Sequence, residues 1–235
     1  CRSSLLGKPA TESFALHPTR HVAFRACLKQ TSTRLERCPD PAPARDAISV
    51  GEALIAAGFR LIEVPLTSSD AFDAIKRLVR DLGDRAVIGA GTVRTLQDVD
   101  MLVAAGGQLM VTPHADTALI RHAASWGLAT LPGIMTPTEA FAALDAGASA
   151  LKIFPAEIIQ PGAIRALRTV LGPQVALCPT GGITPDNMAD YLTAGASGFG
   201  LGGSLYRPGE SPGQVEQHAR AFVTAWQEWK NATDD

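Results

Sequence analysis

The feature that most constrains the fold is a recurring pattern in which a helical segment ends at a glycine and a short apolar run follows at once. The pattern recurs at Gly58, Gly106, Gly127, Gly147 and Gly195. Glycine readily takes the left-handed backbone conformation that ends many helices. Helices that alternate with short apolar strands form βαβ units, in which the strands run parallel. The pattern therefore predicts an α/β protein built on a parallel sheet.

Hydrophobic periodicity gives the number of these units. The expected strands are residues 60–66, 86–90, 108–112, 128–132, 149–154, 175–179 and 197–201, and the expected helices are 70–82, 94–105, 116–126, 137–146, 161–171 and 185–194. A TIM-type (β/α)8 barrel needs an eighth strand, upstream of a helix near 48–57, where Val22–Leu28 is the only apolar candidate. The length of 235 residues suits one such barrel. We predict this fold, with an uncertain first strand.

The first 47 residues differ from the rest in composition. Residues 1–47 carry eight basic and four acidic side chains, a balance of +4, whereas the remainder of the chain carries −6. This segment shows no sustained helical or strand period. A disordered tail, a non-native extension, a wrongly assigned start and a transit peptide are the alternatives. We expect an atypical N-terminal segment at 1–47 and a barrel domain at 48–235.

Composition argues against several classes of function. The formal net charge is −2, and no basic patch interleaved with aromatic residues indicates a nucleic-acid partner. No apolar run approaches the length that spans a membrane. The four cysteines and five histidines have no metal-ligand spacing. We expect a cytoplasmic protein with reduced cysteines, no metal and no cofactor.

Two charged residues interrupt apolar strands. Lys152 lies within Ala150–Pro155, and Glu63 lies within Leu61–Leu66. Burial favours the neutral amine of a lysine, which can attack a ketone and form a Schiff base. Glu63, on another apolar strand, is the candidate for moving the protons. The alternatives are a strand-end lysine that reaches solvent and a structural ion pair between the two residues.

Further polar and glycine residues follow other strands, where barrel enzymes carry their reacting groups. Thr92 follows one strand, and Thr180, Gly181 and Gly182 follow another. Gly202, Gly203 and Ser204 follow the last strand. Glycine loops with free backbone N–H groups commonly bind phosphate. A single glycine pair usually marks only a turn, and Ser204 could equally cap a helix.

These residues belong to a colinear series of motifs over about residues 48–230. The series comprises Glu63–Leu66, Gly89–Val93, Val111–Pro113, Leu131–Gly133, Leu151–Pro155, Gly181–Pro185 and Gly200–Gly202. It resembles the class I aldolases that act on 2-keto-3-deoxy-6-phospho sugar acids. The resemblance implies a homotrimeric TIM-type barrel that forms pyruvate and glyceraldehyde 3-phosphate without a metal. It also implies Lys152 as the Schiff-base lysine, Glu63 as the general acid/base, Thr92 as the carboxylate ligand and the two glycine loops as the phosphate site.

The resemblance gives conflicting indications of which substrate is cleaved. Gluconate-type members usually carry an arginine four residues after the catalytic glutamate, where this chain has Thr67, and this favours the galactonate type. Cys178–Gly182 instead resembles the gluconate type. We expect the galactonate activity, with the gluconate activity as the alternative. A phosphosugar isomerase on the same fold is disfavoured because it needs no lysine imine.

The N-terminus departs from the family pattern. Family members carry a substrate-contacting arginine at the end of the first strand, and the usual spacing from Glu63 leads to the proline-rich stretch near Asp40. Neither Arg37 nor Arg45 lies in a strand-like context, so we assign this role to no residue. A damaged first strand would make an inactive phosphosugar-binding barrel a further alternative.

Overall fold

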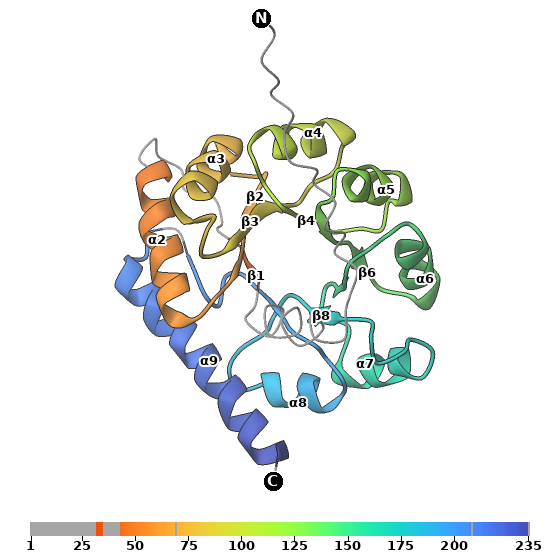
Figure 1. Cartoon of the computed structure of the whole chain (residues 1–235). Helices are drawn as coiled ribbons and strands as arrows, with labels where there is room; N and C mark the ends of the chain where they lie inside the picture. The colour runs from red at the N-terminus through yellow and green to blue at the C-terminus, as the bar shows by residue number, and fades with distance from the viewer. Residues whose placement is uncertain (1–31, 35–42, 69, 208, 235) are drawn as a thin grey trace, which may run out of the picture.

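The chain forms a ring of parallel strands surrounded by helices (Figure 1). The structure, a computed structural model, describes residues 32–34, 43–68, 70–207 and 209–234. The strands are β1 (Ser32–Arg34), β2 (Leu61–Pro65), β3 (Val87–Gly91), β4 (Leu109–Val111), β5 (Ala129–Leu131), β6 (Gly133–Ile134), β7 (Leu151–Ile153), β8 (Leu177–Pro179) and β9 (Gly200–Leu201). The helices are α2 (Pro43–Ala57), α3 (Ala71–Leu82), α4 (Leu96–Ala104), α5 (Thr117–Ser125), α6 (Pro137–Asp145), α7 (Pro161–Arg168), α8 (Met188–Thr193) and α9 (Pro212–Asp234).

The ring closes through two short links. Pro132 separates β5 from β6, so these two segments form one interrupted strand that pairs with β4 on one side and β7 on the other. A single parallel bridge between Thr180 and Gly200 joins the end of β8 to β9, and β9 pairs with β1. The nine segments therefore act as eight strands, and the predicted TIM-type (β/α)8 barrel is confirmed.

The glycines that defined the sequence pattern have the expected conformation. Their φ angles are 109° at Gly58, 80° at Gly106, 77° at Gly127, 100° at Gly147 and 106° at Gly195. Positive φ is unfavourable for residues with a Cβ, which explains why glycine recurs at these helix ends. The seven expected strands lie where the pattern placed them.

Helix α8 is shorter than the expected helix at 185–194. It begins at Met188, because the preceding residues form a turn instead of a helical start. The Thr184 N–H donates to Asn187 Oδ1 at 2.9 Å, and the Asn187 N–H donates to the Thr184 carbonyl at 3.3 Å. This turn ends the loop that joins β8 to α8.

The barrel includes residues from the segment that we expected to be separate. Strand β1 pairs with β2 in a register that aligns Ser32 with Leu61 and Arg34 with Glu63. Helix α2 begins at Pro43, before the expected boundary at residue 48. The candidate first strand at Val22–Leu28 lies outside the described residues, as does most of segment 1–47.

Two apolar layers hold the barrel together. The larger cluster packs the outer faces of the strands against the helices. The smaller cluster fills the inside of the barrel and consists of Leu61, Leu109, Val111, Leu131, Ala150, Ala176 and Cys178. Successive side chains of a strand point to opposite faces, so a residue two positions beyond a member of this inner layer also points inward. The candidate site contains residues that point inward in this way.

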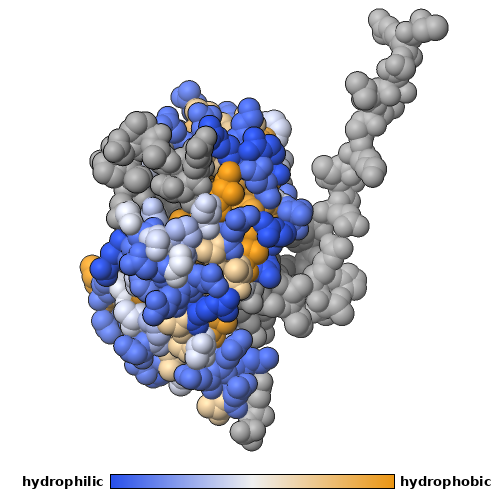
Figure 2. Space-filling model, turned by 90° about the vertical axis from the view of Figure 1, so that its left-hand side faces the viewer, coloured by the Kyte–Doolittle hydropathy of each residue, from blue (hydrophilic) through white to orange (hydrophobic). Residues whose placement is uncertain are grey.

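The last helix packs beside the first described one. Helix α9 lies along α2, on the left of Figure 1. Figure 2 shows that this side of the molecule is largely hydrophilic, with a few apolar residues grouped near its middle. Among the described residues, no helix combines the length and the apolar character needed to cross a bilayer.

Candidate active site

The inner face of the barrel carries two charged residues above its apolar layer. Glu63 lies two positions after Leu61 on β2, and Lys152 lies two positions after Ala150 on β7. Both side chains are buried, with 4% of Glu63 and 8% of Lys152 exposed. The strands run parallel, so both residues lie toward the carboxyl-terminal end of the barrel, where barrel enzymes hold their reacting groups.

The carboxyl group of Glu63 lies directly against the neighbouring strand. A Cβ on Gly91 of β3 would overlap Glu63 Oε2 and lie 2.6 Å from its Cδ. Gly91 is therefore the residue that gives this carboxyl its space. Only a glycine in the adjacent strand allows Glu63 to point inward in its present position.

The amine of Lys152 has an aromatic neighbour. Its Nζ lies 4.7 Å from the centre of the Phe154 ring, and Phe154 is two residues further along the same face of the strand. The backbone N–H of Lys152 donates to the carbonyl of Pro132, so the break between β5 and β6 lies beside the amine-bearing residue. Lys152 is thus held by its own strand and by the preceding one.

Thr92 follows β3 directly and has an unusual backbone conformation. Its φ is 58°, which is unfavourable for a β-branched residue. The next residue, Val93, donates its N–H to the carbonyl of Val111 and so ties this turn to β4. Strained backbone of this kind often occurs at functional sites. Thr92 lies next to Gly91, at the strand end nearest the Glu63 carboxyl.

The first glycine loop adjoins β8. Thr180 lies two positions after the inward-facing Cys178, and a Cβ on Gly200 would overlap its hydroxyl. Gly181 and Gly182 have φ angles of 102° and 65°. In the described part of the chain, the N–H of Gly182 donates to no protein acceptor. The loop therefore presents a backbone donor beside the end of the barrel.

The side chain of one residue that sequence reasoning did not consider, Glu157, lies against this loop. A Cβ on Gly181 would overlap the carboxylate of Glu157, and one on Gly182 would lie 2.7 Å from Glu157 Cγ. The hydroxyl of Tyr191 donates to the carbonyl of Ala156 at 2.9 Å, and burial raises the pKa of Tyr191. Glu157 lies two positions after the Phe154–Pro155 motif, and that position was the only sequence signal for it.

The second glycine loop follows β9. The carbonyl of Gly202 accepts the N–H groups of Leu205 and Tyr206, at 2.8 and 3.1 Å, which forms one helical turn. Gly203 and Ser204 are exposed at the start of this turn. The Thr180–Gly200 bridge joins the strands from which both loops emerge. The structure thus brings together the two glycine loops that sequence analysis assigned to phosphate.

The register of β1 adds a second residue that sequence reasoning did not consider. Arg34 is the last residue of β1, and its Cα is paired with that of Glu63. Its backbone therefore lies at the same level of the barrel as the buried carboxyl. Hydrophobic periodicity did not reveal this strand, because Ser32–Arg34 is too short and too polar to be recognised as one.

Cys178 illustrates how strongly the inside of the barrel is shielded from water. Burial raises the pKa of its thiol to about 12, although the nearby Arg168 opposes this shift. The residue therefore stays protonated at neutral pH and behaves as a small apolar side chain. Among the described residues, no three His, Cys, Asp or Glu side chains gather into a group that could hold a metal ion.

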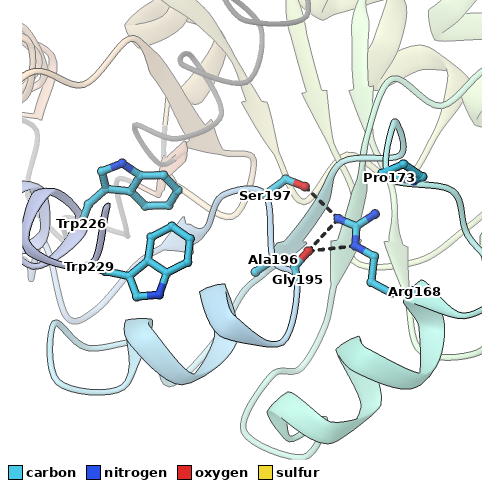
Figure 3. Close-up of a pocket in the computed structure, with 7 residues that line it drawn as sticks. All are labelled: Arg168, Pro173, Gly195, Ala196, Ser197, Trp226 and Trp229. Atoms are coloured by element: carbon cyan, nitrogen blue, oxygen red, sulfur yellow. Dashed lines mark hydrogen bonds between the residues drawn. The ribbon is translucent and has the colours of Figure 1, made fainter. Parts of the chain in front are cut away.

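A separate cavity lies at the opposite end of the barrel. It has a volume of about 290 Å³ and is lined by Arg168, Pro173, Gly195, Ala196, Ser197, Trp226 and Trp229. Figure 3 shows the two tryptophans of α9 on one side and Arg168 on the other. Gly195–Ser197 precede β9, whereas the glycine loop follows it. This cavity is therefore distinct from the site around Lys152.

The fold and the inner-face lysine and glutamate together define a barrel suited to carbonyl chemistry. The family described as "Aldolase: KDPG and KHG aldolase" matches residues 41–217, and the chain belongs to this family. It is therefore a class I aldolase, a carbon–carbon lyase, as the resemblance of its motifs predicted.

Individual relatives show which members of the family this chain is similar to. The chain is 47% identical over 181 residues to the "Probable 2-dehydro-3-deoxy-6-phosphogalactonate aldolase" of Rhizobium meliloti (strain 1021), which covers 77% of this chain and 85% of the relative. It is 45% identical over 183 residues to the "2-dehydro-3-deoxy-6-phosphogalactonate aldolase" of Escherichia coli (strain K12), covering 78% and 89%. A solved structure described as "Native KDPGal structure" superposes with a TM-score of 0.81 at 42% identity, covering 85% of this chain and 96% of that one.

Proposed function

We propose that the protein cleaves 2-dehydro-3-deoxy-6-phosphogalactonate reversibly into pyruvate and D-glyceraldehyde 3-phosphate, with Lys152 as the Schiff-base residue. The observation that carries this proposal is the placement of Lys152 and Glu63 on the inner face of the barrel. Both lie above its apolar layer and are almost completely buried. A buried amine that faces a closed apolar layer is suited to attack a ketone.

The proposed reaction uses Lys152 to draw electrons from the breaking bond. The neutral amine attacks the C2 ketone to give a carbinolamine, which loses water and leaves an iminium ion. The C3–C4 bond then breaks as the C4 hydroxyl loses its proton, and the bonding electrons move through C3 toward the iminium nitrogen. Glyceraldehyde 3-phosphate leaves, the enamine takes a proton at C3, and water hydrolyses the resulting imine to release pyruvate.

Glu63 is the proposed group for these proton transfers. Its carboxyl occupies the space above Gly91, on the inner face of the barrel that also carries Lys152. General acid/base groups of this kind typically contribute a rate factor of about 10² to 10⁴. Its alternative role as a structural partner of Lys152 in the resting enzyme is compatible with catalysis.

The rest of the substrate is assigned to the strand ends around these two residues. We assign the carboxylate of the keto acid to Thr92, whose backbone is held in a strained conformation beside Gly91. We assign the phosphate to Thr180, Gly181 and Gly182 together with the second loop, Gly202, Gly203 and Ser204. Among the described residues, the N–H groups of Gly182, Gly203 and Ser204 have no protein acceptor, and this supports the assignment.

Two residues near the site carry the resemblance that bears on the choice between the two C4 epimers. Thr67 lies in the turn after β2, where the N–H of Ser68 donates to the Pro65 carbonyl at 2.9 Å. Gluconate-type members usually carry an arginine at this position, so its replacement by Thr67 favours the galactonate substrate. Thr180, on the inner face of the barrel, is instead typical of the gluconate type, so cleavage of 2-dehydro-3-deoxy-6-phosphogluconate is the alternative activity.

The decisive experiment is an assay of pyruvate release from the two epimeric phospho acids, with Lys152→Ala and with Lys76→Ala as a matched control. Lys76 is exposed on α3 and lies outside the site. We expect faster release from the galactonate epimer, no release from Lys152→Ala and normal release from Lys76→Ala. Borohydride with pyruvate should label Lys152 alone. Phosphosugar binding without product would indicate the inactive barrel, and product without borohydride sensitivity would exclude the imine.

The homotrimer that the resemblance implies and the cytoplasmic location that the composition indicates stay predictions. The same holds for the absence of a metal or cofactor. Chelators are therefore expected to leave pyruvate release unchanged, which can be measured in the same assay.

A further inference from the structure

The second glycine loop contains a side chain that replaces a backbone hydrogen bond. After the bonds from Leu205 and Tyr206 to Gly202, the next bond of a regular helix would join the Arg207 N–H to the Gly203 carbonyl. The Arg207 N–H donates instead to Glu210 Oε2, at 2.8 Å. The side chain of Arg207 takes its place, because its Nε donates to the Gly203 carbonyl at 3.1 Å.

This contact controls the direction of a neighbouring donor. The Gly203 carbonyl and the Ser204 N–H belong to one peptide unit, which is planar and trans, so the two groups point in opposite directions. Holding the carbonyl on the Arg207 side therefore directs the Ser204 N–H away from Arg207, toward the open start of the turn. Within the described part of the chain, the N–H groups of Gly203 and Ser204 donate to no protein acceptor.

We propose that Arg207 is a positioning residue for the substrate phosphate, which it serves by orienting and polarising the Gly203–Ser204 peptide. A cation on the carbonyl oxygen makes the N–H of the same peptide a stronger donor to an anion. The positive charge also lies within a few residues of the proposed phosphate site. The inference rests on the proposed function, because it assumes that this loop binds the phosphate of the substrate.

The loop has other contacts that keep it folded without this side chain. Besides the two bonds to Gly202, the N–H of Glu210 donates to the Arg207 carbonyl at 3.1 Å. The ring of His218 on α9 lies 3.3 Å from the Leu205 carbonyl. Arg207 is itself exposed. Its replacement should therefore alter phosphate binding more than folding.

The test compares Arg207→Met and Arg207→Lys with Arg220→Met. Arg220 is an exposed arginine of α9 that pairs with Glu216 instead of with the loop. Each variant is assayed with the phosphorylated substrate and with the same keto acid lacking the phosphate. Pyruvate trapping by borohydride then reports Lys152 independently of the phosphate.

For Arg207→Met we expect KM for the phosphorylated substrate to rise about tenfold, with kcat within about twofold. The unphosphorylated acid and the trapping reaction should be unaffected. Arg207→Lys should recover most of the loss, because an ammonium group can also donate to the carbonyl. Arg220→Met should match the parent protein. An unchanged KM in Arg207→Met, or an equal loss with both acids, would overturn the proposal.

Calorimetry with glycerol 3-phosphate and inorganic phosphate provides a test that needs no turnover. Arg207→Met should bind both about tenfold more weakly than the parent protein. If the parent protein fails to trap pyruvate but Arg207→Met still loses phosphate affinity, the proposed function is wrong and the role of Arg207 stands. Equal phosphate affinity in both proteins would reject the role of Arg207.

Discussion

Gly91 and Glu63 show how one missing side chain can prepare a functional group. The carboxyl of Glu63 occupies the volume that a Cβ on Gly91 would need. Gly91 has no positive φ that would require glycine for its backbone. Space for the carboxyl is therefore the physical reason for glycine at this position.

Gly91→Ala is expected to displace the Glu63 carboxyl and to lower kcat on the order of a hundredfold, the lower end of the effect of a lost acid/base group. Steady-state kinetics provides the measurement. Gly213→Ala is the matched control, since an added Cβ there meets no atom within 4 Å. Full activity in Gly91→Ala would show that the position of this carboxyl is not critical.

Glu157 places a negative charge on the glycine loop that we assign to phosphate. Glu157→Gln keeps the shape of the side chain and removes the repulsion between the two anions. We expect KM for the phosphorylated substrate to fall about threefold at low ionic strength, and less at high salt, because this charge is exposed. Glu228→Gln, an exposed change on α9, should have no effect. A higher KM in Glu157→Gln would instead indicate that the carboxylate supports the loop.

At the scale of elements, side chains fix where the helices begin. Helices α4 and α6 both start with a capping box, formed by Thr95 with Asp98 and by Thr136 with Glu139. In α6 the Glu139 carboxylate accepts the N–H groups of Met135 and Thr136, each at 2.8 Å. These bonds, the Met135 bond foremost, hold the pKa of Glu139 below its ordinary value.

Glu139→Gln should lower the free energy of unfolding by about 1 kcal/mol at pH 7. The folded-state pKa of Glu139 is lowered, so its contribution is present above the pKa of the unfolded chain and is lost as the pH falls through the folded-state value. The difference between parent and variant should therefore shrink below about pH 4. Urea unfolding at several pH values provides the measurement. A difference that does not change with pH would contradict this account.

Arg168 ties three segments together at the end of the barrel opposite the site. Its guanidinium donates to the carbonyls of Gly172 and Val175. It also donates to the Gly195 carbonyl and to Ser197 Oγ, as Figure 3 shows. One side chain thus joins the end of α7 to the loops that lead into β8 and β9. Its role is to hold these loops in register.

Arg168→Met should lower the free energy of unfolding by about 2 kcal/mol, because several carbonyls lose a charged donor. Arg165→Met is the control, since Arg165 is exposed on the same helix. Chemical denaturation followed by circular dichroism measures both. If the two variants were equally stable, the hydrogen bonds of Arg168 would add nothing to the net stability.

At the scale of the whole molecule, exposed apolar side chains lie on consecutive helices. Met101 on α4, Trp126 after α5 and Phe141 on α6 are all exposed, at 43%, 56% and 46%. Helix α5 contacts both of its neighbours. Exposed apolar side chains on neighbouring helices are typical of a surface that another subunit covers.

Light scattering should therefore give three times the chain mass for the parent protein, in keeping with the proposed homotrimer. Phe141→Asp places a charge on this exposed surface of α6 and should lower the measured mass at micromolar concentration. A parent protein that stays monomeric on concentration would reject the trimer.

The sequence by itself determined the class of fold and the burial of two charged residues. Helices that end at glycine and alternate with short apolar strands predicted a parallel sheet. Both signals, the positive φ of the glycine and the hydrophobic periodicity of each segment, are set by local sequence. The placement of Lys152 and Glu63 on apolar strands predicted burial, because both interrupt runs that otherwise have no charge. The aldolase family was likewise predicted from colinear motifs, and this prediction is confirmed.

Only the tertiary structure decided which residues meet. The pairing of Ser32–Arg34 with β2 and β9 depends on neighbouring strands, because three polar residues have no strand signal of their own. The contacts of Glu157 with Gly181 and Gly182, and of Glu63 with Gly91, join residues from separate strands or loops. The replacement of a backbone bond by the side chain of Arg207 depends on where Glu210 lies. Local sequence sets the conformation of each segment, whereas such contacts depend on how distant segments pack around one barrel.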